Sequence, residues 1–534
     1  MHVIHDREVI VGVQSSDDTS ECSSGLLLAA SQEWLFEQQP EEPDMFNQAV
    51  ALAIRIPVSR NIVERAVRTV TEAHEAFSLR FRQDPQGVWR QHRAASVDVP
   101  VEFVPLGDMF TGDVARAAAE CAERLHGGLD ISAGPLARVA VLDQGVRADP
   151  LMIFVAHHLI VDSVSWRVLA EDLGHAIDAW AQGRSPQLLP ATGFTDWIAA
   201  QHAAAADWAE EVKFWCDQSP AAVGGPLPGS VPVRHLTVLD AAQTTAVSGE
   251  SEQGRRGPDH VILSALARAL QPGGGPGLLV DIETHGRGEA VPGADASRTI
   301  GWLTATWPLY VPSDPQPVGA AAAGIADRMR EVPRAGQGFG ILRVHPLGAR
   351  LRALPPARVL FTYLGRYSAS GQSAVEIVPA ELGDGRCELR TRRHALTVNA
   401  WIEDGNLSVQ WIGQADEDLG EAAERFASLL RAAAAELAAS GQPTAAAAAA
   451  RAVTETEESV RAAWAQVLPR PESSIGVTDD FFALGGDSIH MIQIASRLRR
   501  TLGVRVPLKV IFDYTTIRDL AAAIDQVRAG TFTF

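Results

Sequence analysis

The sequence predicts an α/β protein of several domains that ends in a small helical bundle. The chain has 534 residues, which is more than one hydrophobic core organises. Up to about residue 440, apolar runs of strand length alternate with amphipathic helical patterns. After an alanine-rich stretch only helical patterns remain, and four of them in succession indicate a bundle.

The composition and charge narrow the class of protein. Apolar residues make up 46% and charged residues 21% of the chain, as in soluble globular proteins. The formal charge of −19 argues against a nucleic-acid partner, which would need a basic surface. Because no run of about 18 apolar residues occurs and residues 1–24 have no apolar signal core, we expect no membrane partner and a cytoplasmic location. The widely spaced cysteines fit neither a disulfide framework nor a metal site: Cys22, Cys121, Cys216 and Cys387.

The first part of the chain is expected to form a flexible tail, residues 1–25, and then one lobe, residues 26–190. Hydrophobic periodicity assigns the elements of this lobe. The expected helices cover 27–38, 63–76, 114–125 and 168–180, and the expected strands cover 49–56, 99–105, 136–142 and 151–156. His74, near the end of the second helix, is interpreted as a structural residue that interacts with the helix dipole.

Two adjacent histidines follow the strand over residues 151–156. Successive strand residues point to opposite faces, so we expect one of His157 and His158 to face the core and the other a cleft. Asp162 follows four residues after His158, ahead of Ser165 and Trp166. An imidazole at a strand end with a carboxylate close behind it suits proton transfer near neutral pH. The alternative is that both rings are structural.

A second lobe, residues 191–440, is expected after the proline break at Pro186 and Pro190. Its expected helices cover 194–201, 210–216, 261–270 and 419–437, and its strands cover 278–282, 395–402 and 407–412, the last two as a hairpin. Residues 249–260 are expected to form a loop. The glycine-rich run 273–277 lacks a following GK[ST] sequence and is interpreted as a turn.

The end of the chain is expected to hold a linker, residues 441–453, and a helical domain, residues 454–530. In it, Asp487 and Ser488 follow two glycines directly before a helix. A helix N-terminus with free N–H groups favours a phosphodiester, so Ser488 is a candidate attachment residue. The alternative is that Ser488 only caps the helix.

The histidine segment resembles a known signature. His157 to Trp166 is similar to the HHxxxDxxSW motif of the epimerization domains of nonribosomal peptide synthetases, which are relatives of condensation domains. Further similar stretches follow in order from residue 26 to residue 440: 32–36, 46–48, 74–81, 283–287, 299–304, 332–343 and 361–365. The resemblance implies a two-lobed, chloramphenicol-acetyltransferase-like pseudo-dimer of the condensation superfamily.

The segment Leu484 to Ile489 resembles the attachment site of peptidyl carrier domains, which are four-helix bundles. This implies that Ser488, preceded by Asp487, carries covalent 4′-phosphopantetheine. It also implies a phosphopantetheinyl transferase as a partner. An apolar patch formed by Ile489, Met491 and Ile492 is the expected docking face of this domain.

The resemblance implies epimerization of an L-aminoacyl or peptidyl residue to its D form while it is bound to the carrier as a thioester. His158 and Glu283, one from each lobe, would exchange protons at Cα, and burial would raise the pKa of Glu283. Asp162 would pair with Arg287 and brace the histidine loop. The remaining site candidates are His157, Trp166 and Tyr363, the last through a hydroxyl directed at the thioester oxygen.

Two other functions remain open at this point: a condensation-type acyltransferase that uses His158, and a non-catalytic platform that docks carrier domains. The sequence departs from the family motifs at Glu75, Ser78, Thr284, Gly288 and Thr362. The substrate is expected to arrive on this chain's own carrier or on another one. An adenylation domain would be supplied elsewhere in a synthetase for a secondary metabolite such as an antibiotic.

Overall fold

A computed structural model describes residues 25–531 of the chain, with gaps. The gaps are 39–41, 108–110, 146–147, 219–231, 249, 252–253, 256, 272, 276, 289–294, 368–372, 383–393, 415–416, 441–453, 469–470, 482–483, 485, 487, 505, 507–509 and 512–513. The expected tail up to residue 24, the expected linker and Asp487 therefore lie outside the described residues. Within them, no helix is long and apolar enough to cross a membrane.

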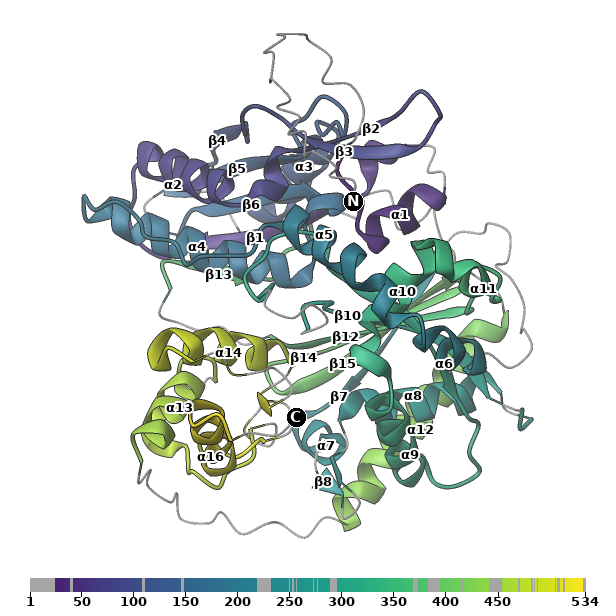
Figure 1. Ribbon diagram of the computed structural model, residues 1–534. Coiled ribbons are helices and arrows are strands. Elements are labelled where there is room, and N and C mark those ends of the chain that lie inside the picture. The colour runs from purple at the N-terminus through teal and green to yellow at the C-terminus, as the bar shows by residue number, and fades with distance from the viewer. Residues whose placement is uncertain are drawn as a thin grey trace, which may run out of the picture.

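The N-terminal lobe is built on a five-stranded sheet in the order β13-β1-β6-β5-β4 (Figure 1). Its strands are β1 (Asn47–Ile54), β4 (Val101–Pro105), β5 (Ala137–Asp143), β6 (Leu151–His157) and β13 (Val375–Val378). Its helices are α1 (Ala30–Glu37), α2 (Arg60–Ala73), α3 (Thr111–His126) and α4 (Ser163–Ala181), and β2 (Leu79–Gln83) pairs with β3 (Trp89–Arg93). Residues 152–157 of the central strand β6 are all buried, as a strand covered on both faces requires.

The C-terminal lobe is built on a six-stranded sheet in the order β11-β10-β12-β14-β15-β7. Its strands are β7 (Pro232–Leu239), β10 (Leu278–Thr284), β11 (Ala305–Val311), β12 (Val359–Tyr367), β14 (Leu396–Glu403) and β15 (Asn406–Gln414). The expected hairpin is confirmed as β14 and β15. Its two-residue turn, Asp404 and Gly405, has φ values of 49° and 82°, which suit the twist of paired strands.

Helices surround this second sheet. They are α5 (Phe194–Ala204), α6 (Glu211–Asp217), α7 (Ala241–Val247), α8 (Pro258–Leu270), α9 (Val318–Arg330), α10 (Gln337–Val344), α11 (Ala349–Arg352) and α12 (Glu417–Ser440). Figure 1 shows α8, α9 and α12 together below the sheet, and α10 and α11 at its upper right. The expected loop over 249–260 contains two short strands, β8 (Glu250–Ser251) and β9 (Gly254–Arg255), and the start of α8.

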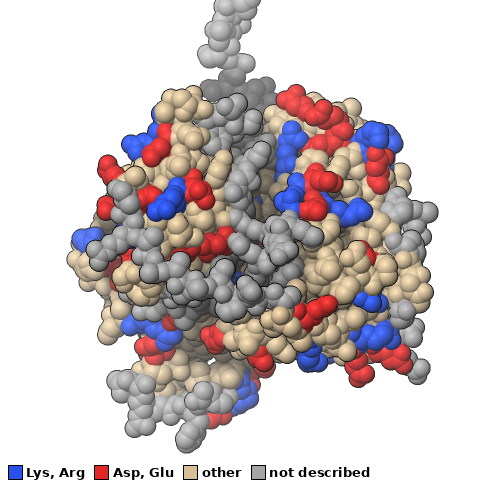
Figure 2. All heavy atoms as spheres, turned by 90° about the horizontal axis from the view of Figure 1, so that it is seen from below, with Lys and Arg blue, Asp and Glu red and all other residues tan. Residues whose placement is uncertain are grey.

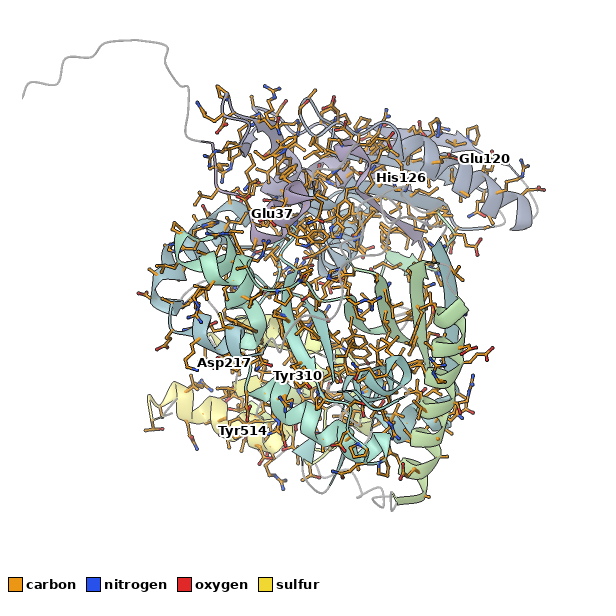
Figure 3. All side chains as sticks on the ribbon, turned by 90° about the vertical axis from the view of Figure 1, so that its right-hand side faces the viewer. Glu37, Glu120, His126, Asp217, Tyr310 and Tyr514 are labelled. Atoms are coloured by element: carbon orange, nitrogen blue, oxygen red, sulfur yellow. The ribbon has the colours of Figure 1, made fainter. Side chains whose placement is uncertain are left out.

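One strand from the C-terminal half of the chain joins the sheet of the N-terminal lobe. Strand β13 comes from the C-terminal half of the chain, yet it pairs antiparallel with β1 of the N-terminal sheet, with Ala51 opposite Val378 and Ile54 opposite Val375. The expected division at residue 190 therefore describes the order of the chain and not the composition of the sheets. Figure 3, turned from Figure 1, shows the N-terminal lobe with His126 and Glu120 above the C-terminal lobe with Tyr310.

The last part of the chain has its own core. Helices α13 (Glu455–Ala465), α14 (Ser488–Leu502) and α16 (Ile517–Arg528) enclose buried side chains that include Trp464, Phe481, Ile494 and Ile524. Val510 and Ile511 lie in a further helical turn. This domain lies beside both lobes, with α14 nearest to the N-terminal lobe (Figure 1). Seen from below, acidic and basic side chains are interspersed over the visible face (Figure 2).

Candidate active site

The two histidines differ in burial, as strand alternation predicts. His157 is fully buried at the end of β6. Its ring Nε2 donates to the carbonyl of Pro43 at 2.7 Å, and its Nδ1 accepts the N–H of Leu159 at 3.1 Å. Burial lowers the pKa of His157 to about 3. With both nitrogens occupied and the ring neutral, His157 holds the histidine loop, residues 157–162, in place. It has no nitrogen left for proton transfer.

His158, in contrast to His157, is a partly exposed residue. Its Nδ1 lies 2.8 Å from the carbonyl oxygen of Val161. A carbonyl only accepts, so Nδ1 carries the proton and Nε2 keeps its lone pair. Burial lowers the pKa of His158 from its usual value, while Asp162 acts in the other direction. At neutral pH His158 is therefore a neutral base with a fixed tautomer.

Asp162 and Arg287 form a buried, bidentate ion pair between the lobes. Arg287 donates from Nη1 to Oδ2 of Asp162 at 2.7 Å and from Nη2 to Oδ1 at 2.8 Å. Ser165 donates to Asp162 from its backbone N–H and from its hydroxyl, both at 2.8 Å. The side chain of Arg287 is 0% exposed and that of Asp162 2%. The expected pairing is confirmed, and it fixes the start of α4 behind His158.

A segment of the C-terminal lobe, residues 295–304, crosses to this loop; we call it the bridging segment. Its Leu303 N–H donates to Asp162 at 3.0 Å, and its Gly301 N–H donates to the Ser165 hydroxyl at 3.1 Å. Gly286 makes this approach possible: its φ is 65°, and a Cβ there would lie 1.6 Å from the carbonyl oxygen of Leu303.

Aromatic rings enclose His158. Trp302, on the bridging segment, has its ring centroid 4.3 Å from the imidazole centroid, and Phe46 stacks on the imidazole at 5.1 Å. These rings remove water from the imidazole, which is the cause of its lowered pKa. Both residues lie in stretches that resemble family motifs, but sequence reasoning assigned a role to neither of them.

Glu283 lies near the end of β10, in a cavity of about 110 Å³. Trp302 also lines this cavity, together with apolar side chains that include Trp34, Leu279, Phe339 and Leu360. Burial raises the pKa of Glu283 to about 7, and the charge of Asp162 also raises it. The Thr362 hydroxyl donates to Oε1 of Glu283 at 3.4 Å and opposes this rise. The carboxyl is therefore close to half protonated at neutral pH.

A second acidic group lies in the same cavity. Asp281 precedes Glu283 by two residues on β10, so both side chains lie on one face of the strand. Its Oδ2 is 2.7 Å from Nε2 of His394, and both residues are buried and line the cavity. This pair was not predicted from the sequence. The alternation along β10 would have placed Asp281 beside Glu283, whereas His394 is distant in sequence.

His158 and Glu283, the two candidate proton carriers, come from different lobes, and Trp302 and Asp162 influence both of them. Trp302 contacts the ring of His158 and lines the cavity that contains Glu283. The charge of Asp162 acts on the pKa of both groups. A neutral base and a carboxyl that is about half protonated at neutral pH therefore lie near the bridging segment.

Two other candidates have structural positions. The Trp166 indole donates to Oε1 of Gln48 at 2.8 Å and packs on Phe154, and is buried within the N-terminal lobe. Tyr363 follows Thr362 on β12 and therefore lies on the opposite strand face from the Glu283 contact. It packs against the hydrophobic core. The expected hydroxyl contact with a thioester oxygen gains no support from this position.

The motif departures are accommodated locally. Ser78 donates to the carbonyl of Glu75 at 2.7 Å, and the Thr284 hydroxyl lies 3.4 Å from the carbonyl of Ala305. A Cβ at Gly288 would lie 1.8 Å from Nε2 of Gln337, so that glutamine occupies the space which a longer residue would need. His74 caps α2 and contacts Asp172 at 2.8 Å, in agreement with the expected structural role.

The carrier-like domain presents Ser488 as the first residue of α14, which has 15 residues. Before it, Gly486 packs against the Phe481 ring, where a Cβ would lie 2.1 Å from a ring carbon. This contact fixes the approach to a helix N-terminus of the kind that stabilises a phosphodiester. The local structure therefore fits a phosphopantetheine attachment site. Among the described residues no cluster of His, Cys, Asp and Glu could hold a metal ion.

Comparisons with known proteins agree with this architecture. Residues 24–443 match the Condensation domain family, and residues 458–524 match the phosphopantetheine attachment site family. Similar folds among solved structures include the epimerization domain from the third module of tyrocidine synthetase B, with a TM-score of 0.68 and 21% identity over 80% of this chain and 99% of that one. A starter condensation domain of rhizomide synthetase has a TM-score of 0.60 at 16% identity, over 77% and 95%.

The curated relatives are synthases that are much longer than this chain. Chondramide synthase cmdD of Chondromyces crocatus is 29% identical over 423 residues, which is 75% of this chain and 11% of that protein. Bacitracin synthase 3 of Bacillus licheniformis is 26% identical over 407 residues, which is 72% of this chain and 6% of that protein. The chain thus spans about a tenth or less of these relatives. It belongs to the condensation-domain family and carries, after that domain, a carrier domain with covalently attached 4′-phosphopantetheine.

Proposed function

We propose that this chain epimerizes an aminoacyl or peptidyl residue, from the L to the D form, while that residue is bound to a carrier as a thioester. His158 and Glu283 exchange protons at Cα from opposite sides. The observation that carries this proposal is the pair of opposite pKa shifts: burial lowers the pKa of His158 and raises that of Glu283 to about 7. Inversion needs one base and one acid at the same time, and these shifts favour that combination.

The proton inventory of the pair explains how one site can work in both directions. In the active form the pair holds one proton, on Glu283, and His158 Nε2 is available to accept another. His158 removes a proton from one face of Cα while Glu283 returns its own to the other face. The reverse reaction starts with the proton on His158 and the negative charge on Glu283. Both directions use the same total of one proton, so they share one pH dependence.

The remaining groups hold this geometry. When bound, 4′-phosphopantetheine carries the acyl group as a thioester, whose carbonyl accepts the negative charge that develops when Cα loses its proton. The Asp162–Arg287 pair fixes the histidine loop and the bridging segment relative to each other. Trp302 and Phe46 exclude water from the His158 ring. The apolar wall beside Glu283 supports a substrate residue with an apolar side chain.

Ser488 is the proposed attachment residue of the arm, loaded by a phosphopantetheinyl transferase from coenzyme A. Such a chain fits a cytoplasmic nonribosomal peptide synthetase in which an adenylation domain elsewhere supplies the amino acid. The names of the synthases that share this family support this context. Ser488→Ala should remove the mass increase that follows incubation with the transferase and coenzyme A.

The deciding experiment uses the chain loaded with an L-aminoacyl-phosphopantetheine in deuterated water. The proposal expects deuterium at Cα and a mixture of D and L product after hydrolysis of the thioester. Retention of the Cα hydrogen and of the L configuration would contradict it.

A condensation reaction is the second candidate, because one specific observation favours it. His158 has a free Nε2 and is neutral, and such a base could assist attack of an amine on a thioester. Adding a second, amine-bearing carrier substrate to the same assay separates the two: condensation gives a new amide and epimerization gives deuterium at Cα. A platform without activity gives neither product.

A further inference from the structure

The carrier domain contacts the condensation-family domain through polar side chains of α14. Gln493 donates from Nε2 to Oε1 of Glu171, on α4, at 3.0 Å. Six residues later on the helix, Arg499 pairs with Asp295, the first residue of the bridging segment, at 2.7 Å. Glu171 also pairs with Arg298 at 2.7 Å. The first contact thus joins the carrier to a charge network that already crosses between the lobes.

The start of α14 faces a cavity of about 610 Å³ between the domains. His490 and Gln493 line it from the carrier side, and Arg167 and Arg366 line it from the lobe side. His490 is only two residues after Ser488, which places the beginning of the helix within one turn of this cavity. Guanidinium and carboxylate groups both line this cavity, so it is a polar space beside the N-terminal turn of α14.

This contact region continues into the proposed active site. Arg167, which lines the cavity, directly follows Trp166 on α4, and its guanidinium donates to the carbonyls of Leu364 and Arg366. Asp295, which contacts the carrier, is seven residues before Trp302 on the bridging segment. The carrier therefore touches the two segments that hold His158 and its ring stack in place.

We propose that this polar surface is where the chain's own carrier docks to present its acyl arm, so that a carrier that follows the catalytic domain delivers substrate to it within one chain. This inference rests on the proposed function and names its partner. The expected apolar docking face is wrong at Met491, which is 1% exposed and belongs to the core of the carrier. The side chains of Ile489 and Ile492, the other two residues of that expected face, lie outside what the structure describes. The polar residues Gln493 and Arg499 make the contact in its place.

The connection between the domains favours this occupant over a carrier from another protein. Helix α12 ends at Ser440 and α13 begins at Glu455, so 13 residues, 441–453, and the capping residue Thr454 join them. A chain of that length spans at most about 50 Å, which keeps the carrier near the surface at an effective concentration on the order of millimolar. A separate carrier would have to compete with that concentration.

Crosslinking tests the docking without any catalysis. The full chain with Glu171→Cys and Gln493→Cys is treated with a short bismaleimide, and crosslinked peptides are identified by mass spectrometry. The control pair is Glu171→Cys with Arg528→Cys, at the end of α16 on another part of the carrier. We expect a crosslink between positions 171 and 493 that exceeds the control yield at least tenfold. Equal yields for the two pairs would overturn the proposed surface.

Charge reversal tests whether the docked state is productive. Arg499→Glu and Asp295→Arg should each slow Cα exchange of the carrier-bound substrate by about three- to tenfold, because each places like charges together. The double variant, with both charges reversed, should recover most of the rate. Arg528→Glu reverses a charge outside the contact and should have no effect. If the rate of the double variant is reduced by the product of the two single fold-changes, the ion pair is not part of the productive complex.

Dilution identifies the carrier that is used. The first-order rate of exchange should stay constant over a hundredfold dilution of the loaded chain. A rate that falls in proportion to concentration would show delivery between chains and overturn the proposal. Failure of the docking and failure of the function remain distinguishable. A chain that crosslinks as expected but exchanges neither its own substrate nor a small acyl thioester contradicts the proposed function, not the surface.

Discussion

Both lobes bury their candidate proton carrier, but burial shifts the two pKa values in opposite directions: it lowers that of His158 and raises that of Glu283. In each lobe the residue lies at the end of a largely buried strand: His158 directly follows β6, and Glu283 lies near the end of β10. In each case loss of water is the largest cause of the pKa shift. Desolvation disfavours the charged form, which is the cation for histidine and the anion for glutamate. One physical effect therefore favours a neutral base in one lobe and a protonated acid in the other.

The largest effect is expected when one of the two proton-carrying side chains is removed at a time. His158→Gln or Glu283→Gln should each reduce inversion by about 10²- to 10⁴-fold, because each leaves only an acid or only a base. Deuterium exchange measured separately on L and D substrates sharpens the assignment. Each variant should retain exchange from only one enantiomer, and the two variants should retain it from opposite ones.

Two substitutions with similar chemistry serve as controls. Glu33→Gln removes another carboxyl whose pKa is raised by burial, and His126→Gln removes another imidazole whose pKa is lowered by burial. Figure 3 shows His126 in the upper part of the N-terminal lobe. Both controls should invert substrate at the normal rate. Normal inversion in both test variants would remove the pair from the mechanism.

The connection between the lobes can be broken at Asp162. Asp162→Ala leaves Arg287 buried without its carboxylate partner, so we expect a loss of about 3–5 kcal/mol in the free energy of unfolding. Adding Arg287→Met should recover part of that loss. Chemical denaturation followed by tryptophan fluorescence measures both. Asp217→Ala, which removes the exposed partner of Lys213 on α6, should change stability by no more than about 0.5 kcal/mol. A similarly small effect of Asp162→Ala would contradict the bracing role.

The aromatic enclosure of His158 can be opened at Trp302. Trp302→Leu removes the ring at 4.3 Å and admits water, so the pKa of His158 should rise toward its usual value. The acid limb of the pH–rate profile should then move to higher pH, and the rate should fall by about three- to tenfold. Trp411→Leu in the core of the C-terminal lobe is the matched control for loss of an indole. An unmoved acid limb would show that Trp302 does not set the state of His158.

The smallest predicted effect is on the basic limb. Both directions of the reaction need one proton on the pair, so the rate should fall as pH rises through about 7, where Glu283 loses its proton. The Thr362 hydroxyl stabilises the carboxylate and holds this pKa down. Thr362→Val should therefore shift the basic limb slightly to higher pH, while Thr237→Val on β7 should leave it in place. A shift to lower pH would reverse the assigned sign.

The sequence predicted the parts of the site that depend on local order. Alternation along one strand separated the roles of His157 and His158, and the motif resemblance supplied the partner of Asp162. The alternation also would have placed Asp281 beside Glu283, had it been followed along β10. These inferences succeed because neighbouring residues on a strand have fixed relative directions.

The sequence could not predict the parts that depend on contacts between distant segments. Nothing in Val375–Val378 identifies β1 as its partner, and nothing near Trp302 places its ring on His158. The apolar side of α14 was interpreted as a surface, although an amphipathic helix turns that side toward the core of its own domain. Met491 follows this rule, and the described contacts of Gln493 and Arg499 with the other domain are polar.

Because strand β13 joins the N-terminal sheet from the C-terminal half of the chain, the first lobe is incomplete when it is expressed alone. A fragment that stops at residue 190 lacks β13, so β1 would become the edge of its sheet with four residues, 51–54, deprived of their partner. Unprotected edges of this kind pair with other molecules. We therefore expect the isolated first lobe to self-associate, and a synthetic peptide covering residues 373–379 to suppress that association by occupying the open edge.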